Sequence, residues 1–335
     1  MATIKLNKNN LYYNLNQLSL KCGNKDKIAA VLKDNAYGHG IDIIANLVSK
    51  YGIKEAVVVN NQEALKIKNL FKNILILNDK PIKSNNFSYA INSLEDLKDI
   101  PKWVKIELKV DTGMHRNGIC IKEIPIAIDI IKRRGLNLFG IFTHFRSADV
   151  LSSELFWQRE KFKDVKRAFL NSGFKPRFHS HNSAATLRSK NYIDNESIAR
   201  VGIAMYGYNE LPSQFEEIKL KPVLSLYANR ISTRELKRGD RVGYGGDFIA
   251  NDDMVVSTYD VGYGSGLFRG DSKKPLFTCE GLPIIGRVSM DSIIVASIKD
   301  EICIFNDAKR VAKHFNTISY EITTRLNPFI KREIV

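Results

Sequence analysis

The chain has 335 residues, of which 44% are hydrophobic and 10% aromatic, and it carries a formal net charge of +15. This length exceeds what one hydrophobic core usually supports, so we expect one large domain and a smaller one. No apolar run approaches the roughly 20 residues that span a bilayer, and the first residues do not resemble a signal peptide. The composition therefore excludes a disordered or integral membrane protein and predicts a cytoplasmic one.

Lysine and arginine residues are spread along the whole chain, with acidic and asparagine residues between them. A nucleic-acid-binding protein concentrates its basic residues on one face, so we expect no nucleic-acid partner. Nucleic-acid binding stays the weaker alternative. The positive charge is better suited to attracting anionic substrates and phosphate cofactors.

The cysteines are Cys22, Cys120, Cys279 and Cys303. They include no CxxC pair, which predicts reduced thiols rather than a disulfide framework or a zinc site. His179 and His181 would share one face of a strand, but no neighbouring carboxylate or cysteine accompanies them. We therefore expect no metal.

From about residue 28, short β-branched runs alternate with amphipathic stretches, which is typical of βα units on a parallel sheet. The strand candidates are residues 28–33, 56–59, 74–77, 87–91, 104–110, 138–144, 177–182 and 197–202. The helix candidates include residues 41–52, 61–70, 124–134 and 153–173. Eight such units predict an α/β fold, a (β/α)8 TIM barrel over residues 1–220, with the active site at the C-terminal ends of its strands.

The pattern changes after about residue 220. The remaining segments are short, rich in β-branched residues and punctuated by glycine and proline, which predicts a mostly antiparallel β domain over residues 221–335. One helix is expected over residues 306–315, opened by Asn306 or Asp307 as the N-cap.

The first informative motif is VLKDNAYGHG at residues 31–40, in which Lys33 ends an apolar strand. A lysine at the mouth of a barrel is a candidate Schiff-base former, because partial burial lowers its pKa and frees the amine. The ordinary alternative is a solvated lysine at a strand end.

Polar motifs also end the other predicted strands, and this convergence favours a functional reading of Lys33. They are DTGMHR (111–116), THF (143–145), HNSAA (181–185) and ARVGIAMYG (199–207). The last two suit phosphate binding, because Ser183 offers a hydroxyl while Gly202 and Ile203 offer backbone N–H groups at a turn.

With these motifs the chain resembles bacterial alanine racemases over essentially its whole length. The matching segments are AVLKDNAYGHG, LKVDTGMHRNG, FTHFRSAD, HSHNSAA, ARVGIAMYG, RVGYGG, VGYGSG and GRVSMD, in the family's order. The resemblance implies an isomerase that uses pyridoxal 5'-phosphate to interconvert L- and D-alanine, a small amino-acid substrate. It also implies a homodimer and a supply of D-alanine for peptidoglycan.

The resemblance further implies a two-base mechanism. Lys33 would hold the cofactor as an aldimine and act as the base on one face of the substrate Cα. Tyr244 would be the base on the opposite face, and in this family it arrives from the partner subunit. Opposed bases are needed, because a proton returned to the face it left regenerates the same enantiomer.

The resemblance assigns the remaining site residues in two groups. Around the cofactor, Arg200 would face the pyridine nitrogen, His144 would pack on the ring and orient Arg200, and Tyr37, Ser183, Gly202 and Ile203 would hold the phosphate. Around the substrate, Arg116 would bind the carboxylate and the cofactor's phenolic oxygen, and Met290 with Asp291 would shape the substrate end across the dimer.

Lys109 matches a lysine that the family often carries as a carbamate, whose negative charge could fix Arg116. The alternative is an unmodified lysine with a small anion nearby. The chain departs from the family pattern in two places. Ser265 replaces an acidic residue in GYGSG, while Tyr263 and Arg269 remain. The C-terminus has no unambiguous counterpart of the family's phosphate-binding tyrosine. We expect Tyr320 to be structural.

Other readings keep the cofactor but change the chemistry. A broader amino-acid racemase acting on serine shares this architecture, and serine differs from alanine by one hydroxyl. A related decarboxylase would place a carboxylate, not Arg200, at the pyridine nitrogen. A non-catalytic cofactor-binding barrel would lack the C-terminal β domain.

Overall fold

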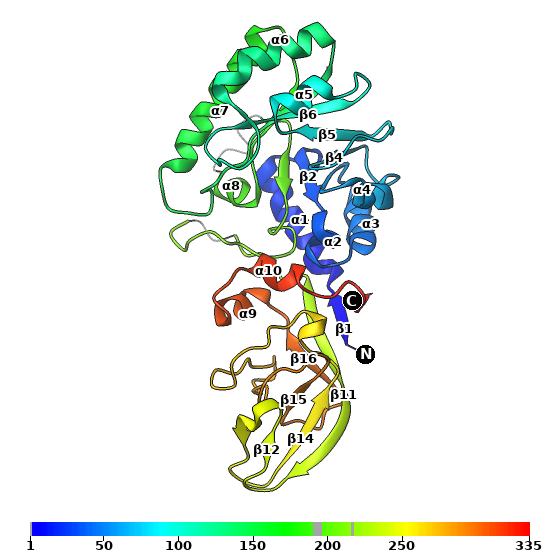
Figure 1. The fold of residues 1–335 in the computed structure, drawn as a ribbon, viewed down its shortest axis with the longest axis vertical. Helices are drawn as coiled ribbons and strands as arrows, with labels where there is room; N and C mark the ends of the chain where they lie inside the picture. The colour runs from blue at the N-terminus through cyan, green and yellow to red at the C-terminus, as the bar shows by residue number, and fades with distance from the viewer. Residues whose placement is uncertain (1, 190–195, 216–217) are drawn as a thin grey trace. The chain divides into compact units, whose positions relative to one another are not determined.

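The computed structural model describes residues 2–189, 196–215 and 218–335. It forms two compact units (Figure 1). The barrel unit comprises residues 12–36 and 41–220, and the C-terminal unit comprises residues 1–11, 37–40 and 221–335. The N-terminal residues and a four-residue piece of the Lys33 motif therefore lie with the C-terminal sheet.

The barrel unit is built on parallel strands in the order β10-β2-β3-β4-β5-β6-β8-β9, with a short β7 (Ile119–Cys120) beside β6. Their bounds are β2 (Ile28–Val31), β3 (Glu55–Val58), β4 (Asn73–Ile76), β5 (Phe87–Ile91), β6 (Lys105–Asp111), β8 (Asn137–Phe142), β9 (Arg177–His179) and β10 (Ala199–Val201). Two backbone hydrogen bonds link the chain at β9 and at β10, the two ends of this strand order. Ser197 N–H donates to Phe178 O (3.0 Å), and Arg200 N–H donates to His181 O (2.9 Å). The barrel is nearly closed, and the predicted (β/α)8 class is confirmed.

Helices surround these strands (Figure 1). They are α1 (Lys8–Cys22), α3 (Ile41–Tyr51), α4 (Asn61–Ile67), α5 (Leu94–Asp99), α6 (Ile124–Arg134), α7 (Glu154–Asn171) and α8 (Ser183–Arg188). Helix α6 shows why the sequence pattern was readable. Its buried residues Ile124, Ala127 and Ile131 recur at helical spacing, and Gly135 ends it in the left-handed conformation at φ 61°.

The C-terminal unit contains a six-stranded sheet in the order β15-β14-β11-β1-β17, with β16 paired to β11. The strands are β1 (Thr3–Leu6), β11 (Leu224–Leu236), β14 (Met254–Tyr259), β15 (Ile293–Val295), β16 (Glu301–Phe305) and β17 (Lys331–Ile334). All pairs are antiparallel except β1 with β17. The predicted antiparallel character is confirmed, and the N-terminal strand lies between β11 and the C-terminal strand.

Smaller elements complete this unit. They are the hairpin β12 (Arg241–Val242) with β13 (Phe248–Ile249), and the helices α9 (Ala308–His314) and α10 (Ser319–Thr324). Asp307 is the N-cap of α9, since its side chain accepts a hydrogen bond from Lys309 N–H. This agrees with the second of the two N-caps expected from the sequence.

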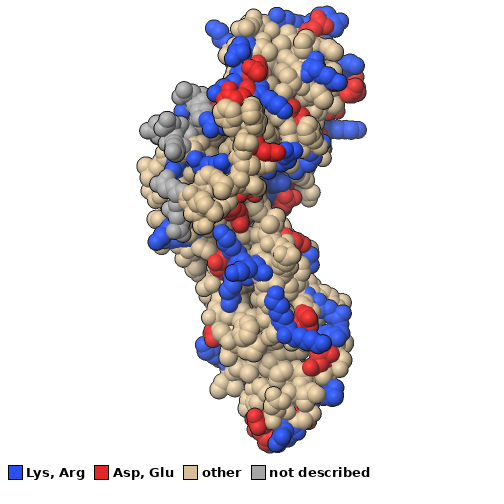
Figure 2. All heavy atoms as spheres, turned by 90° about the vertical axis from the view of Figure 1, so that its left-hand side faces the viewer, with Lys and Arg blue, Asp and Glu red and all other residues tan. Residues whose placement is uncertain are grey.

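One face of the molecule has a mixed charge. Figure 2 shows Lys and Arg side chains on both parts of this face, with Asp and Glu among them. Within the described ranges, no helix is both long enough and apolar enough to cross a membrane.

We expect Gly38→Ala to lower the free energy of unfolding of the C-terminal unit by more than about 3 kcal/mol. Gly38 has φ +79°, and a Cβ there would lie 1.8 Å from the carbonyl oxygen of Thr323. The control is Gly239→Ala, because Gly239 has φ +93° but no atom within 4 Å of its Cβ position. It should lose only about 1–2 kcal/mol. Equal losses in urea unfolding of the two variants would contradict this packing argument.

Candidate active site

Lys33 follows β2 and begins α2 (Lys33–Tyr37), a turn of unusual backbone conformation. Four successive residues, 34–37, have φ between 52° and 54°. The left-handed conformation costs each non-glycine residue about 1–2 kcal/mol, so the surrounding structure must hold the turn. Asn35 does this on both sides: its N–H donates to Glu63 Oε1 (3.0 Å), and its Oδ1 accepts from Ile41 N–H (2.9 Å). The strained turn fixes the chain directly beyond the lysine.

Four cations gather at the C-terminal ends of the barrel strands. Burial, followed by the charges of Arg200, Arg116, Lys109 and Lys33 in that order, lowers the pKa of His144 to about 3. These residues come from β10, β6 and the loops after β2 and β6. Lys33 Nζ lies 3.5 Å from Asp34 Oδ2. Among the described residues, no ion pair is formed by Lys109, Arg116 or Arg200, so the cluster is suited to an anion.

Lys109 is a buried member of the cluster, with 8% of its surface exposed. Burial, with Arg116 and Arg200 nearby, lowers the pKa of its amine to about 8. Gly118 allows the loop after β6 to close over it, because a Cβ there would lie within 3.2 Å of Lys109 atoms. Asp111 shapes the same loop by accepting backbone hydrogen bonds from residues 113–115. Arg116, at the tip of this loop, is exposed.

Arg200 is buried, with 6% of its surface exposed. Its Nη1 donates to His179 Nδ1 (2.6 Å) and His179 O (3.0 Å), and its Nη2 donates to Thr143 O (2.6 Å) and Ser180 O (3.2 Å). These bonds use four of the five guanidinium hydrogens, and Nε–H makes no bond to the described residues. Burial lowers the pKa of Arg200 to about 10, while Glu196 and Glu107 oppose that shift.

Behind Arg200, His179 donates through Nε2 to Glu107 Oε2 (2.7 Å). Since a carboxylate only accepts, Nε2 carries the hydrogen and Nδ1 accepts from Arg200. Burial lowers the pKa of His179 to about 4, so the ring is neutral at pH 7. Burial alone would raise the pKa of Glu107, but Arg177 and His179 hold it far below its usual range. Arg177 Nη2 donates to Glu107 Oε1 at 2.6 Å.

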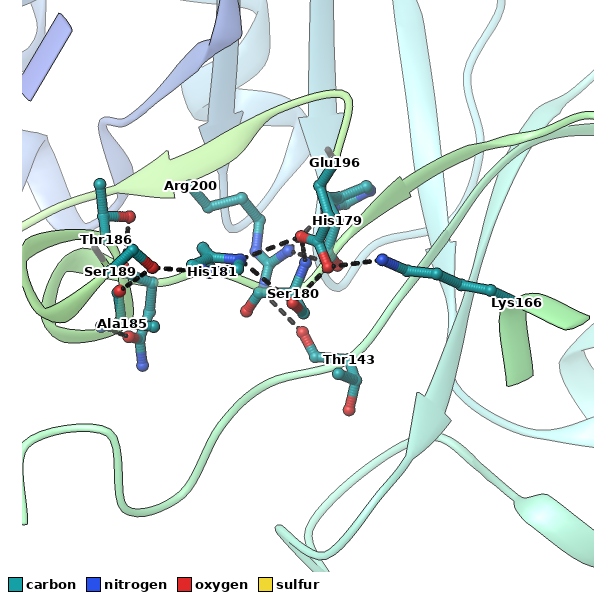
Figure 3. A network of polar contacts seen from close by, with 11 residues as sticks. Thr143, Lys166, His179, Ser180, His181, Ala185, Thr186, Ser189, Glu196 and Arg200 are labelled. Atoms are coloured by element: carbon teal, nitrogen blue, oxygen red, sulfur yellow. Dashed lines mark hydrogen bonds and ion pairs between the residues drawn. The ribbon is translucent and has the colours of Figure 1, made fainter. Parts of the chain in front are cut away.

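A second buried carboxylate, that of Glu196, supports Arg200 through Ser180 (Figure 3). Glu196 accepts from Ser180 N–H (2.5 Å), from Ser180 Oγ (2.6 Å) and from Lys166 Nζ (3.0 Å), and it contacts His181 Nδ1 at 3.2 Å. The carbonyl of Ser180 is one of the acceptors for Arg200. Glu196 thereby fixes Ser180, whose carbonyl oxygen accepts from Arg200.

Ser183 begins α8, and its Oγ accepts hydrogen bonds from Gly202 N–H (3.0 Å) and Ala204 N–H (3.3 Å). Asn182 caps the helix by accepting from Ala185 N–H. The structure therefore brings Ser183, Gly202 and Ile203 together at the ends of β9 and β10. A hydroxyl beside successive backbone N–H groups is the kind of donor set that binds a phosphate.

The C-terminal unit contains the other expected residues. Tyr37 packs against Tyr320, with ring centroids 5.7 Å apart, so Tyr320 supports a residue that we assigned to the phosphate. Tyr244 is 63% exposed in η3 (Tyr244–Gly246), and Met290 is 55% exposed. Asp291 is exposed as well.

The departure GYGSG forms η4 (Tyr263–Ser265). Gly264 N–H donates to Met290 O at 2.8 Å, and Gly262 leaves only 2.3 Å between its Cβ position and the same oxygen. Ser265 Oγ accepts from Gly262 N–H at 3.4 Å. The η4 turn and the Met290 loop are thus bonded together, and Ser265 closes the turn.

Comparison with known proteins identifies the family. The model of the alanine racemase N-terminal domain matches residues 6–210, and that of the C-terminal domain matches residues 223–334. The chain belongs to the alanine racemase family. Its activity is the isomerase reaction of that family, the interconversion of L- and D-alanine, which confirms the predicted function.

The similarity extends over full lengths. The chain is 49% identical to the alanine racemase of a Nitratiruptor species, covering 99% of both chains. The solved alanine racemase of Clostridium difficile 630 shares 26% identity at a TM-score of 0.90, with 100% of this chain and 95% of that chain covered. The alanine racemase of Bartonella henselae with covalently bound pyridoxal phosphate shares 26% identity at a TM-score of 0.84, covering 100% and 99%. These relatives do not favour the serine racemase or decarboxylase readings.

No sequence motif pointed to Glu107, Arg177 or Glu196, and His179 was considered only as a metal ligand. We expected His144 to orient Arg200, but in the described part of the chain His179, Thr143 and Ser180 hold it. One signal was present. Lys105, Glu107, Lys109 and Asp111 alternate with apolar residues along β6, which places four charged side chains on one face.

We expect the free energy of unfolding to fall by about 2 kcal/mol between pH 7 and pH 5 because of His179. An unfolded histidine binds its proton near pH 6.5, whereas folded His179 binds one only near pH 4. Between these values the unfolded chain holds more protons, so acid favours unfolding.

The test is urea unfolding of three proteins across this interval. His179→Gln should lose about 2 kcal/mol less than the unaltered protein, while His115→Gln should keep the full slope, because the side chain of His115 is 76% exposed. Identical slopes for His179→Gln and the unaltered protein would contradict a neutral His179.

Proposed function

We propose that the chain binds pyridoxal 5'-phosphate through Lys33 and racemises alanine with two bases, Lys33 and Tyr244 of the partner subunit. The observation that carries the proposal is the cation cluster of Lys33, Lys109, Arg116 and Arg200 around His144. The charges of such a cluster repel one another unless anions occupy it. The phosphate and phenolic oxygen of the cofactor and the substrate carboxylate supply that negative charge.

The donor set fits this cofactor. Lys33 offers the amine for the covalent link, and Ser183, Gly202 and Ile203 offer donors for the phosphate. The family resemblance adds the hydroxyl of Tyr37. The remaining Nε–H of Arg200 suits an acceptor such as the pyridine nitrogen. When bound, pyridoxal phosphate supplies an electron sink that makes the substrate Cα–H acidic. The covalently bound cofactor in the Bartonella henselae relative supports the same assignment.

Arg200 determines how far that electron sink extends. A guanidinium whose pKa is about 10 keeps its proton at neutral pH, so Arg200 donates a hydrogen bond and does not protonate its acceptor. This limits charge delocalisation and suppresses side reactions such as transamination. Arg116 binds the substrate carboxylate. Met290 and Asp291 of the partner subunit limit the size of the substrate.

The two bases divide the proton transfer. Lys33 Nζ removes or returns the Cα proton on one face of the substrate, and Tyr244 Oη does so on the other. The exposure of Tyr244, at 63%, leaves its hydroxyl available to a second copy of the chain. The active form is then a homodimer in which each subunit completes the other's site. We place it in the cytoplasm, where it supplies D-alanine for peptidoglycan.

We expect a mixture of Lys33→Ala and Tyr244→Phe proteins, each inactive alone, to regain about a quarter of the unaltered activity. After random reassembly half of the dimers are mixed, and one of their two sites carries both intact bases. The measurement is racemisation followed by optical rotation, after the mixture has been dissociated and refolded together. If both bases came from one subunit, mixing would restore nothing.

We also propose that Lys109 carries a carbamate. Its pKa of about 8 raises the fraction of neutral amine at neutral pH by about two orders of magnitude over an ordinary lysine. The neutral Nζ attacks carbon dioxide, an N–C bond forms and a proton leaves the nitrogen. The resulting anion stabilises the positions of Arg116 and Arg200, which both lie close enough to depress the lysine's pKa.

Labelled carbon dioxide tests this modification. In buffer with 13C-bicarbonate, the purified protein should show one carbamate carbon resonance. Lys109→Arg should abolish it, while Lys105→Arg, at the start of the same strand, should leave it unchanged. Persistence of the resonance in Lys109→Arg would place the carbamate elsewhere.

A further inference from the structure

Two cysteines of the C-terminal unit lie in direct contact, although they are 24 residues apart in the sequence. The Sγ atoms of Cys279 and Cys303 are separated by 2.8 Å. The backbone holds them there, because Cys279 N–H donates to the carbonyl oxygen of Cys303 at 2.8 Å. A disulfide bond measures about 2.05 Å, so the sulfurs need to approach by less than about 1 Å.

The neighbours of the pair hold both segments together. Arg310 donates through Nη1 to Thr278 O (3.2 Å) and through Nη2 to Ile304 O (3.4 Å), which are the residues beside the two cysteines. Tyr227 of β11 lies opposite Cys303 in the sheet register. The contact therefore has support from a guanidinium and from a strand ladder.

The two thiols differ in their surroundings. Cys279 is exposed, whereas Cys303 is buried in β16. The hydrogen bond with Cys303 and then the nearby charge of Arg310 lower the pKa of Cys279, although burial opposes this. The pKa of Cys303 is raised, first by its hydrogen bond with Cys279 and then by burial. Cys279 is therefore the accessible thiol that ionises more readily, and Cys303 is the thiol behind it.

We propose that Cys279 and Cys303 form a redox modification site, at which a hydroperoxide oxidises the exposed Cys279 and Cys303 resolves it to an intrachain disulfide. Neither cysteine belongs to the racemisation site.

The chemistry proceeds in two balanced steps. The thiolate of Cys279 attacks hydrogen peroxide, an S–O bond forms, the O–O bond breaks, and the leaving hydroxide takes a proton to become water. The sulfur of Cys303 then attacks the sulfenic acid on Cys279, the S–S bond forms and the S–O bond breaks. The leaving hydroxide becomes water with the proton of Cys303, so the two thiols lose two electrons to one peroxide.

The other cysteines provide internal comparisons. Cys22 is fully buried, and burial raises the pKa of its thiol to about 12, so it should not react. Cys120 is exposed in the barrel unit. In the described part of the chain it has no second cysteine beside it, so its oxidation cannot end in an intrachain disulfide.

The experiment treats the purified, reduced protein with hydrogen peroxide, alkylates the remaining thiols, and maps the peptides by mass spectrometry without reduction. We expect one cross-linked peptide pair joining Cys279 to Cys303, lighter by two hydrogen atoms and released by dithiothreitol. The closed loop should also raise the melting temperature of the C-terminal unit by a few degrees. Cys120→Ser should show the same cross-link and the same shift.

The single variants test the order of events. Cys303→Ser should accumulate a sulfenic acid on Cys279 that dimedone traps, whereas Cys279→Ser should leave Cys303 reduced. If peroxide leaves both cysteines of the unaltered protein alkylatable, or carries Cys279 to the sulfinic acid without a cross-link, the proposal is wrong. The cross-link is measured on the unaltered protein, so the test does not depend on whether the variants fold.

Discussion

The burial of one guanidinium, that of Arg200, sets the demands that the rest of the barrel interior meets. A charged group taken out of water is destabilising unless hydrogen bonds and opposite charges compensate it. Four carbonyl and imidazole acceptors satisfy its terminal nitrogens. Two buried carboxylates supply the opposing charge without touching the guanidinium. His179 lies between Glu107 and Arg200, and Ser180 lies between Glu196 and Arg200. The result is a donor with a fixed position and one remaining N–H.

The same interior explains why the cations at the strand ends can coexist. Glu107 and Glu196 balance the charge of Arg200, while Lys109 and Arg116 form no ion pair within the described residues and remain for anionic ligands. The left-handed turn after Lys33 adds a second constraint, because four strained residues keep their conformation only if their neighbours hold them. The strained turn lowers the folding stability directly beside Lys33, where the position of the lysine must be fixed. This is consistent with a site that exists before its ligands bind.

Much of this architecture could be predicted from local patterns. Helix α6 was readable from its apolar spacing and from Gly135, and the site residues at strand ends follow from the geometry of parallel sheets. The sheet position of β1 could not be predicted, because its partner β11 begins more than 200 residues later. The turn at residues 34–37 contains no glycine to signal a positive φ. Glu107 and His179 are 72 residues apart, and the strand order β6-β8-β9 brings them together.

The central claim is that this cation-rich site holds pyridoxal phosphate on Lys33, and borohydride reduction tests it most directly. The protein is reconstituted with pyridoxal phosphate, reduced, digested, and searched for a phosphopyridoxyl group by mass spectrometry. The account predicts the label on the peptide that contains Lys33, with loss of the cofactor's absorbance band near about 420 nm. A label distributed over surface lysines, with Lys33 unmodified, would contradict it.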